Sequence, residues 1–242
     1  MLAQGGTIAG NDVNFIADGT GGVGGLQGPS GTGTGAIGNG GDGTGGTAII
    51  EVQEGSPGIV TLQNVLASAN GTGGTGLVTG VGAGGRIEIT DTSIDPAGLI
   101  GFNNLTVNAF DTGVGAAVGS GSTLTGGFFV TGNSGAMSIL GDLTVNVAGD
   151  IEYRLDGDSQ MTVGGNANLT SGRDILIDHV NNATAVNSID VSGSFAAAAQ
   201  GNFTSSDGSL INAAATATVR AEQNAAIADI AGVGLVDISA LF

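Results

Sequence analysis

The segment GDLTVNV at residues 141–147 is followed, after a single alanine, by GDIEYRL at residues 149–155. Each segment begins with Gly-Asp and then places an apolar side chain at every second position. Leu143, Val145 and Val147 therefore share one face of the first segment. Alternation with a period of two is typical of a β-strand with one buried face. The two segments predict two short strands whose apolar faces line the same core.

Similar segments follow almost to the end of the chain. They have four to six residues, alternate in polarity and are bounded by Gly, Asn or Asp, and they begin near residues 160, 166, 173, 187, 201, 225 and 234. Strand starts recur about every eight residues, and every second or third start is about 18 to 25 residues from the last. Internal repeats of this length are typical of solenoids, in which each coil buries its apolar face against its neighbours.

Spacing alone does not exclude a β-sandwich, whose strands recur at similar intervals. Three features favour a coil: the strands are very short, their apolar residues are small aliphatics that can stack in columns, and the boundaries carry Gly, Asn and Asp. We expect these boundary residues to tolerate the left-handed conformation of a tight bend. The sequence therefore predicts an all-β fold, a single parallel β-solenoid domain over residues 1–242, most regular over 141–242. An Ala-rich helix at 213–228 is an alternative for that stretch.

Two glycine-rich runs interrupt the first half of the chain. They occupy residues 19–47 and 71–85, and strand-like segments such as 48–52 and 85–90 lie between and after them. Glycine-rich sequence usually behaves as flexible chain, so the simpler expectation is Gly-rich loops that leave the coil. The alternative is a close-packed glycine layer.

Composition excludes several classes of function. The chain has 49 Gly, 21 acidic and 4 basic residues, a net charge of −17 and no Cys, yet 40% of its residues are hydrophobic. This hydrophobic content predicts a folded core, and the scarcity of basic residues argues against nucleic acid as a partner. No apolar run approaches the length of a membrane span, so we expect no membrane insertion. The start lacks the features of a signal peptide, and both ends suggest a fragment of a longer chain.

Four of the repeated units resemble those of a known family: GDLTV at 141–145, GDIEY at 149–153, GRDILI at 172–177 and GNFTS at 201–205. They are similar to repeats of filamentous-haemagglutinin-type exoproteins, which include two-partner-secretion and autotransporter passengers of bacterial surfaces. The resemblance implies a right-handed parallel β-helix, extracellular on a Gram-negative cell surface, with a role in adhesion, biofilm or scaffolding. Its partners would be a host or neighbouring-cell surface, or a polysaccharide.

Two other functions remain open. The ends of a solenoid are open strand edges, so the chain could be a fibre subunit that stacks on itself end to end. A polysaccharide-active β-helix enzyme would instead need carboxylates from adjacent coils to converge in a groove. The closest carboxylate pairs are Asp156 with Asp158 and Asp91 with Asp95. We expect these to be solvated turn residues, and the sequence predicts no catalytic residue and no enzyme.

Calcium is the one cofactor that the sequence suggests. Acidic side chains without lysines suit a cation that prefers oxygen ligands, and the candidate ligands are Asp42, within NGGDGTG at 39–45, together with Asp156 and Asp158. The only histidine, His179, is expected in a solvated turn.

Other motifs carry less information. Gly-rich matches to a dinucleotide fingerprint at 33–38 and 80–85 are followed by no helix that would bind a pyrophosphate. Asn-x-Thr sequons, which accept glycans in secreted proteins, occur at Asn70, Asn104, Asn168, Asn182 and Asn202.

Overall fold

A computed structural model describes the architecture of most of the chain. The described residues are 1–3, 6–24, 39–53, 58–91, 99–112, 127–132, 136–156, 160–180, 187–206, 209–232 and 234–240. Within these ranges every regular element is a strand, and residues 213–228 contain no helix. All the strand pairs among them are parallel.

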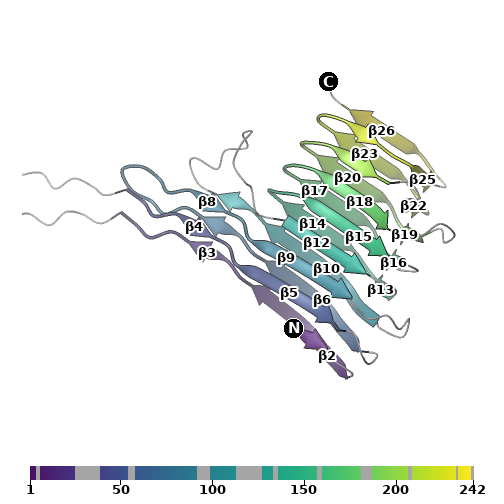
Figure 1. The fold of residues 1–242 in the computed structure, drawn as a ribbon, viewed down its shortest axis with the longest axis horizontal. Helices are drawn as coiled ribbons and strands as arrows, with labels where there is room; N and C mark the ends of the chain where they lie inside the picture. Colours follow the sequence, from purple (N-terminus) through teal and green to yellow (C-terminus); the bar gives the residue numbers. More distant parts are fainter. Residues whose placement is uncertain are drawn as a thin grey trace, which may run out of the picture.

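Two large sheets face each other along the molecule (Figure 1). The eight-stranded sheet, here sheet A, has the order β1 (Leu2–Ala3), β5 (Thr47–Val52), β9 (Arg86–Asp91), β12 (Gly127–Gly132), β15 (Ile151–Asp156), β18 (Ile175–Val180), β21 (Phe203–Ser205) and β24 (Ala225–Ala226). The thirteen-stranded sheet, here sheet B, begins with three long strands: β2 (Thr7–Ile16), β6 (Ile59–Ser68) and β10 (Leu99–Ala109).

Above β10, each coil contributes two short strands to sheet B instead of one long strand. The first of each pair comes from β13 (Ala136–Ile139), β16 (Gln160–Val163), β19 (Asn187–Val191), β22 (Ser209–Ala213) and β25 (Asp229–Gly232). The second comes from β14 (Leu143–Val147), β17 (Ala167–Ser171), β20 (Phe195–Ala199), β23 (Ala217–Ala221) and β26 (Val236–Ala240). Each strand lies beside its counterpart one coil away, which is the topology of a parallel β-helix and confirms the predicted fold class.

The change from one strand to two occurs where β10 pairs with both β13 and β14. Phe102 is opposite Ile139, and Leu105 is opposite Leu143. The upper coil therefore has one more residue between the two pairings than β10 has. This extra residue makes a corner between the two halves of sheet B, and the later coils keep it.

The core is one continuous column of stacked apolar side chains. Leu143, Val145 and Val147 are at most 2% exposed, as their alternation predicts, and Ile151 and Tyr153 are fully buried. Columns run vertically through the coils by register, and one of them contains Leu105, Leu143, Ala167, Phe195 and Ala217. From Leu143 upward, large and small side chains alternate within this column, so the coils fill the interior together.

Glycines at the corners have a different purpose from the one expected. The corner glycines Gly141, Gly165 and Gly193 do not adopt a left-handed backbone, so the expectation that corner glycines supply such bends is wrong for these residues. They are needed for close approach instead. A Cβ on Gly141 would lie 2.2 Å from Asn104 Oδ1, and a Cβ on Gly165 would lie 2.3 Å from Asp142 Oδ1. The side chain of the coil below occupies the space that a larger residue would require.

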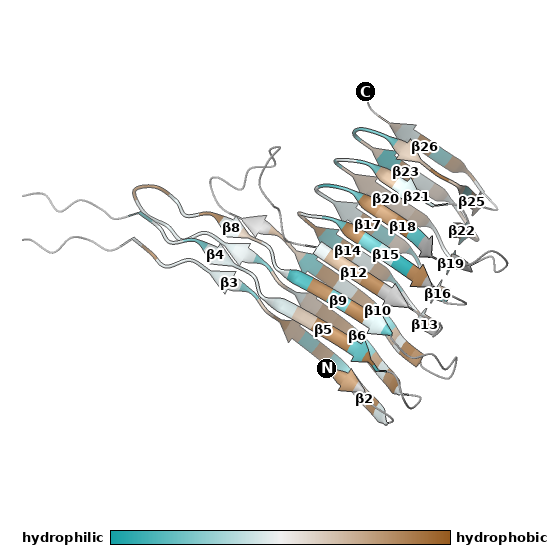
Figure 2. Ribbon diagram, viewed as in Figure 1, coloured by the Kyte–Doolittle hydropathy of each residue, from teal (hydrophilic) through white to brown (hydrophobic). Residues whose placement is uncertain are grey.

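The described parts of the two glycine runs form an arm that projects from the lower coils (Figure 1). It contains β3 (Gly19–Thr20), β7 (Gly71–Thr72) and β11 (Asp111–Thr112) in one small sheet and β4 (Gly43–Thr44) and β8 (Gly82–Ala83) in another. In each of the two lower coils, one segment runs outward and a second returns beside it. Figure 2 shows apolar residues on the stretch between β7 and β8, where Leu77 and Val78 are 70% and 58% exposed.

The two small sheets of the arm are in direct backbone contact. Gly41 N donates to Gly22 O at 2.8 Å, and Gly74 N donates to Gly41 O at 2.8 Å. A Cβ on Gly21 would lie 1.8 Å from Gly41 O, and one on Gly73 would lie 1.8 Å from Gly80 O. Of the two alternatives for the glycine runs, the described residues form the close-packed glycine layer. Residues 25–38 lie outside the described part of the chain.

Substituting Gly21 with Ala tests this packing. The new Cβ would collide with the backbone of Gly41, so we expect the arm to separate, at a cost of about 1–3 kcal/mol for an overpacked interior. Hydrogen exchange should show loss of protection at the Gly41 and Gly74 amides. Gly22→Ala is the matched control, because a Cβ there meets nothing within 4 Å. Equal protection in both variants would contradict the glycine layer.

Tyr153 is a polar exception inside the core. Its ring meets Phe128 edge to face, with centroids 5.8 Å apart and planes at 87°. Its hydroxyl is buried without a hydrogen-bond partner in the described structure, and this burial raises the pKa of Tyr153 far above its ordinary value. A buried hydroxyl without a partner destabilises the fold by about 1–3 kcal/mol.

Removing this hydroxyl should stabilise the protein. We expect Tyr153→Phe to raise the free energy of unfolding by about 1 kcal/mol, because the ring contact with Phe128 remains. Chemical denaturation measures the difference. Tyr153→Leu removes the ring as well and should destabilise. A large loss of stability in Tyr153→Phe would show that the hydroxyl has a partner after all.

Candidate functional site

Polar side chains form a vertical ladder along the bend of sheet B. Its members, here the corner ladder, are Asp12, Asn64, Asn104, Asp142, Asn166, Ser194 and Thr216, one from each successive coil. In the lower coils, Asn64 Nδ2 donates to Asp12 Oδ1 at 2.8 Å. Higher up, the backbone N–H of Asn166 donates to Asp142 Oδ1 at 2.8 Å, and that of Ser194 donates to Asn166 Oδ1 at 3.0 Å.

A second ladder lies before the strands of sheet A and contains Asp150, Asp174, Asn202 and Asn224. Asp174 Oδ1 accepts hydrogen bonds from Asn202 N at 2.6 Å and from Asn202 Nδ2 at 3.0 Å. Arg173 Nη1 is 3.5 Å from Asp150 Oδ2. Two carboxylates on adjacent coils thus stack here, and both accept hydrogen bonds from the backbone of the next coil. The pairs Gly149-Asp150 and Gly201-Asn202 were the sequence signal for two of these four positions.

The two ladders have consequences for the sequons. Asn104 Nδ2 donates to Asn64 Oδ1 at 2.9 Å, and Asn70 Nδ2 donates to Ser68 Oγ at 2.8 Å. Asn202 Nδ2 is bonded to Asp174 in the same way. An N-linked glycan takes one of the two hydrogens of the side-chain nitrogen, and each of these three nitrogens already donates one of them to a neighbour. Asn168, in contrast, is exposed on β17, and Asn182 lies outside the described residues.

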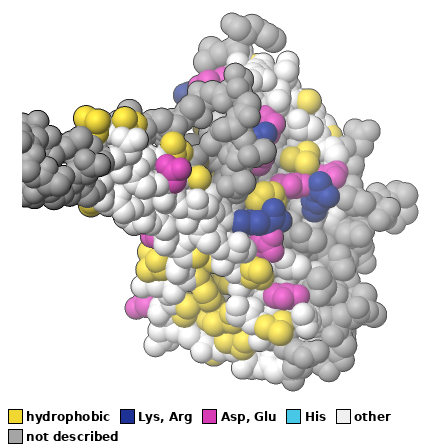
Figure 3. Space-filling view, turned by 60° about the vertical axis from the view of Figure 1, so that its left-hand side comes forward, with side chains coloured by type: hydrophobic (Ala, Val, Ile, Leu, Met, Phe, Trp, Pro, Cys, Tyr) yellow, Lys and Arg dark blue, Asp and Glu magenta, His cyan; other side chains and the backbone are white. Residues whose placement is uncertain are grey.

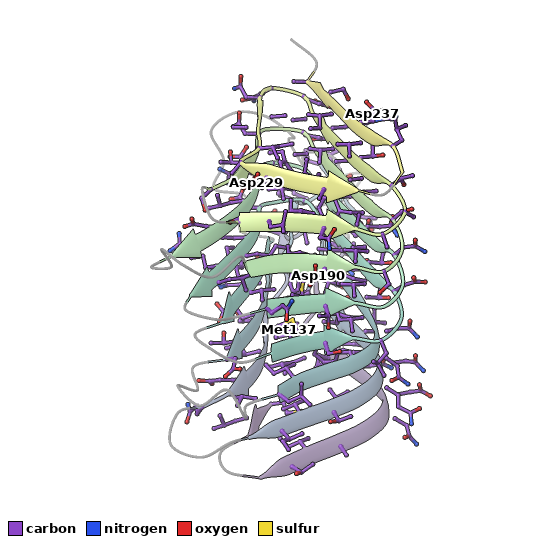
Figure 4. The ribbon with its side chains drawn as sticks, turned by 90° about the vertical axis from the view of Figure 1, so that its right-hand side faces the viewer. Met137, Asp190, Asp229 and Asp237 are labelled. Carbon is purple, nitrogen blue, oxygen red and sulfur yellow. The ribbon has the colours of Figure 1, made fainter. Side chains whose placement is uncertain are left out.

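The outer face of sheet B has a smaller polar cluster. Figure 4 looks onto the half of sheet B that contains β13, β19 and β25, and it labels Asp190 on β19. Asp190 accepts hydrogen bonds from Gln160 Nε2 at 2.7 Å and from Asn212 Nδ2 at 3.1 Å. It therefore joins three consecutive coils across the outside of the solenoid.

Charged and aromatic side chains gather on the outer face of sheet A. This group, here the arginine face, consists of Arg86, Glu88, Phe129, Glu152 and Arg154. Arginine and acidic side chains are seen side by side there, near the foot of the arm (Figure 3). Arg86 pairs with Glu88 and Arg154 with Glu152, each within its own strand. The guanidinium carbon of Arg86 lies 3.7 Å from the centre of the Phe129 ring.

The strand register of sheet A fixes the order of side chains across the arginine face. Phe129 is opposite Glu88 on one side and Glu152 on the other. The two glutamates are therefore two strand spacings apart, about 9.6 Å, and each is bound to an arginine. The arrangement presents an aromatic ring between two ion pairs, with the Arg86 and Arg154 side chains 46% and 59% exposed. Such a face can bind a partner through polar and stacking contacts.

The structure describes only some of the residues that the sequence singled out as candidate ligands. Asp42 is exposed in the arm, and its Oδ1 accepts a hydrogen bond from Val81 N at 2.8 Å. Asp156 ends β15, its side chain is not described, and Asp158 lies outside the described residues. No group of three or more His, Cys, Asp or Glu that could hold a metal ion occurs in the described ranges. Calcium binding at these residues stays a prediction.

Two further expectations about single residues are wrong. Asp91 is an inward-facing residue of β9 and is 4% exposed, so it is not in a solvated turn. Its suggested partner, Asp95, lies outside the described residues. His179 belongs to β18, where its backbone is opposite Leu155, and so is not in a turn either. The fingerprint match at 80–85 lies in the glycine arm and leads into a strand, while that at 33–38 is not described.

Comparison with known proteins gives no relative. No protein family, no curated protein and no solved structure matches this chain. Among the described residues, no helix has the length and hydrophobicity to cross a membrane.

Substitution of Asn166 measures the worth of the corner ladder. Asn166→Ala removes the acceptor of the Ser194 N–H and the link to Asp142, so we expect a loss of about 1 kcal/mol in the free energy of unfolding. The control is Asn168→Ala, two residues away on the exposed face of β17, which should change stability by less than about 0.5 kcal/mol. Similar losses in both variants would show that the ladder adds nothing.

Proposed function

We propose that this chain is an extracellular structural and adhesive module of a bacterial surface or secreted protein. The observation that carries the proposal is the unbroken core column from Ile50 to Ala221, with ladders of side chains on its outside. Every coil is joined to the next by backbone hydrogen bonds, by core contacts and by side-chain hydrogen bonds. Such a molecule resists bending, which suits a spacer or scaffold.

The shape supports the same proposal. The eight strands of sheet A stack at about 4.8 Å per coil, which gives a shaft about 34 Å tall. The net charge of −17 and the absence of lysine favour a hydrated, soluble surface. The similarity of the Gly-Asp repeats to filamentous-haemagglutinin-type exoproteins supports a location outside the cell.

The arginine face is the part of the module best suited to adhesive contact. The chain has only 4 basic residues. Arg86 and Arg154 are both exposed on this face, and the Arg86 guanidinium lies over the Phe129 ring. Arginine and aromatic side chains are enriched at the energetic centres of binding surfaces. Sugars or proteins of a neighbouring cell surface would offer the hydroxyl and carbonyl groups that these side chains bind.

Two measurements test the proposal. Antibodies against the chain should stain intact cells of the source organism, and external protease should remove the signal; staining only after lysis would contradict an extracellular location.

Beads that carry the protein should adhere to cells, and Phe129→Ala with Arg86→Ala should reduce adhesion about tenfold, the effect of losing a contact of about 1.4 kcal/mol. Thr144→Ala, on the outer face of sheet B, is the control and should leave adhesion unchanged.

A further inference from the structure

Both ends of the described solenoid leave strands with one free edge. At the lower end, β2 pairs with β6 and with no other described strand; at the upper end, β25 pairs only with β22 and β26 only with β23. Ile238 and Val236 of β26 are 45% and 38% exposed, although residues of the same columns inside the solenoid are buried. Ile8, Val13 and Phe15 of β2 are also only partly buried.

The inward-facing residues at the two ends match column by column. One column begins at Ile8 and ends at Ile230, and the next begins at Gly10 and ends at Gly232. Across the bend, one column runs from Val13 to Val236, and its neighbour runs from Phe15 to Ile238. Each end would therefore continue the columns of the other with a residue of the same or similar size.

The two glycines show how closely the ends correspond. The interior residues of their column decrease in size from Leu62 and Phe102 to Ala213, and both end coils have glycine. A Cβ on Gly10 would lie 3.0 Å from Val13 Cγ2, and a Cβ on Gly232 would lie 3.3 Å from Val236 Cγ2. At both ends, the valine across the bend occupies the space beside the glycine. The two end coils thus have the same pair of neighbours, a glycine beside a valine.

The edge strands have little to prevent pairing. Natural edge strands avoid it with lysine, proline or bulges, but β2, β25 and β26 contain neither lysine nor proline. Each has one outward-facing or corner aspartate; those of the upper end, Asp229 and Asp237, are labelled on the top coil in Figure 4. Their charge would slow association without blocking the hydrogen-bonding edge.

We propose that a second copy of this chain stacks on the first head to tail, with β2 of one copy against β25 and β26 of the other. The new contact would have the parallel register of the coils inside each copy, with Phe15 against Ile238 and Val13 against Val236. Repetition of the contact would produce a fibre. This inference goes beyond the role of a surface module and depends on the end coils, not on the arginine face.

Charge predicts how the assembly responds to salt. Each copy has a net charge of −17, so copies repel each other at low ionic strength. Raising NaCl from about 0.02 M to about 0.5 M shortens the Debye length from about 20 Å to about 4 Å, and should strengthen association. Sedimentation equilibrium of the 242-residue chain should give masses that rise from 23.1 kDa with concentration, and electron microscopy should show rods of variable length.

Two variants, each with one end blocked, test the direction of stacking. Phe15→Arg places a charge on the lower end and Ile238→Arg places one on the upper end; each variant alone should remain monomeric. A mixture of the two should form dimers and nothing larger, because one intact upper end and one intact lower end remain. The dimers would also prove that both variants are folded. Asn14→Arg and Ser239→Arg, which face outward from the same strands, are the controls and should assemble like the wild type.

Three outcomes would overturn the proposal. A wild-type chain that stays at 23.1 kDa in high salt would mean that these edges are covered by another protein or by a further stretch of chain. Dimers of either variant alone would indicate head-to-head contact. Assembly that neither variant affects would place the contact elsewhere, for example on the arginine face.

Discussion

Everything in this molecule depends on one constraint: each coil must repeat the backbone path of the coil below it. Parallel strands hydrogen-bond to both neighbours at a spacing of about 4.8 Å, so a residue added to one coil must leave the shared path. Ladder partners on successive coils are 52, 40, 38, 24, 28 and 22 residues apart. In the two lower coils the described extra residues form the arm, and the stacked columns remain aligned.

Glycine has two uses under this constraint. In the arm, the outgoing and returning segments approach until their backbones bond to each other, and the space between them holds no side chains. At the corners, glycine makes room for the ladder residue of the coil below, as Gly141 does for Asn104. Both uses concern close approach of backbone and not the left-handed conformation. A chain with 49 Gly can therefore be ordered wherever its glycines face other backbone.

The same repetition connects the fold to the two proposals. A column that continues through every coil makes the shaft stiff, which suits a surface module. It also makes the two end coils resemble interior coils that have lost a neighbour, which is why Val13 and Phe15 correspond to Val236 and Ile238. The arginine face has a different origin, because its members become neighbours only through the pairing of β9, β12 and β15.

The sequence by itself determined the class of fold and the orientation of the best strands. Alternation placed Leu143, Val145 and Val147 inside, and the repeat length indicated coils. Among the strands that it missed are the alanine-rich β20 and β23, because alanine has no strand preference of its own. These segments form strands because they pair with the strands of neighbouring coils, and Ala197 and Ala217 are buried there.

Only the tertiary structure decided the functional surfaces. The Gly-Asp pairs were visible, but the hydrogen bonds of the corner ladder join residues that are 22 to 52 positions apart, and the register of distant strands selects the partners. Phe129 meets Arg86 for the same reason. The alternation of apolar and polar residues within a strand indicates which side of that strand faces the core. Which residues meet across coils depends on the length of each intervening loop, and no short stretch of sequence contains that information.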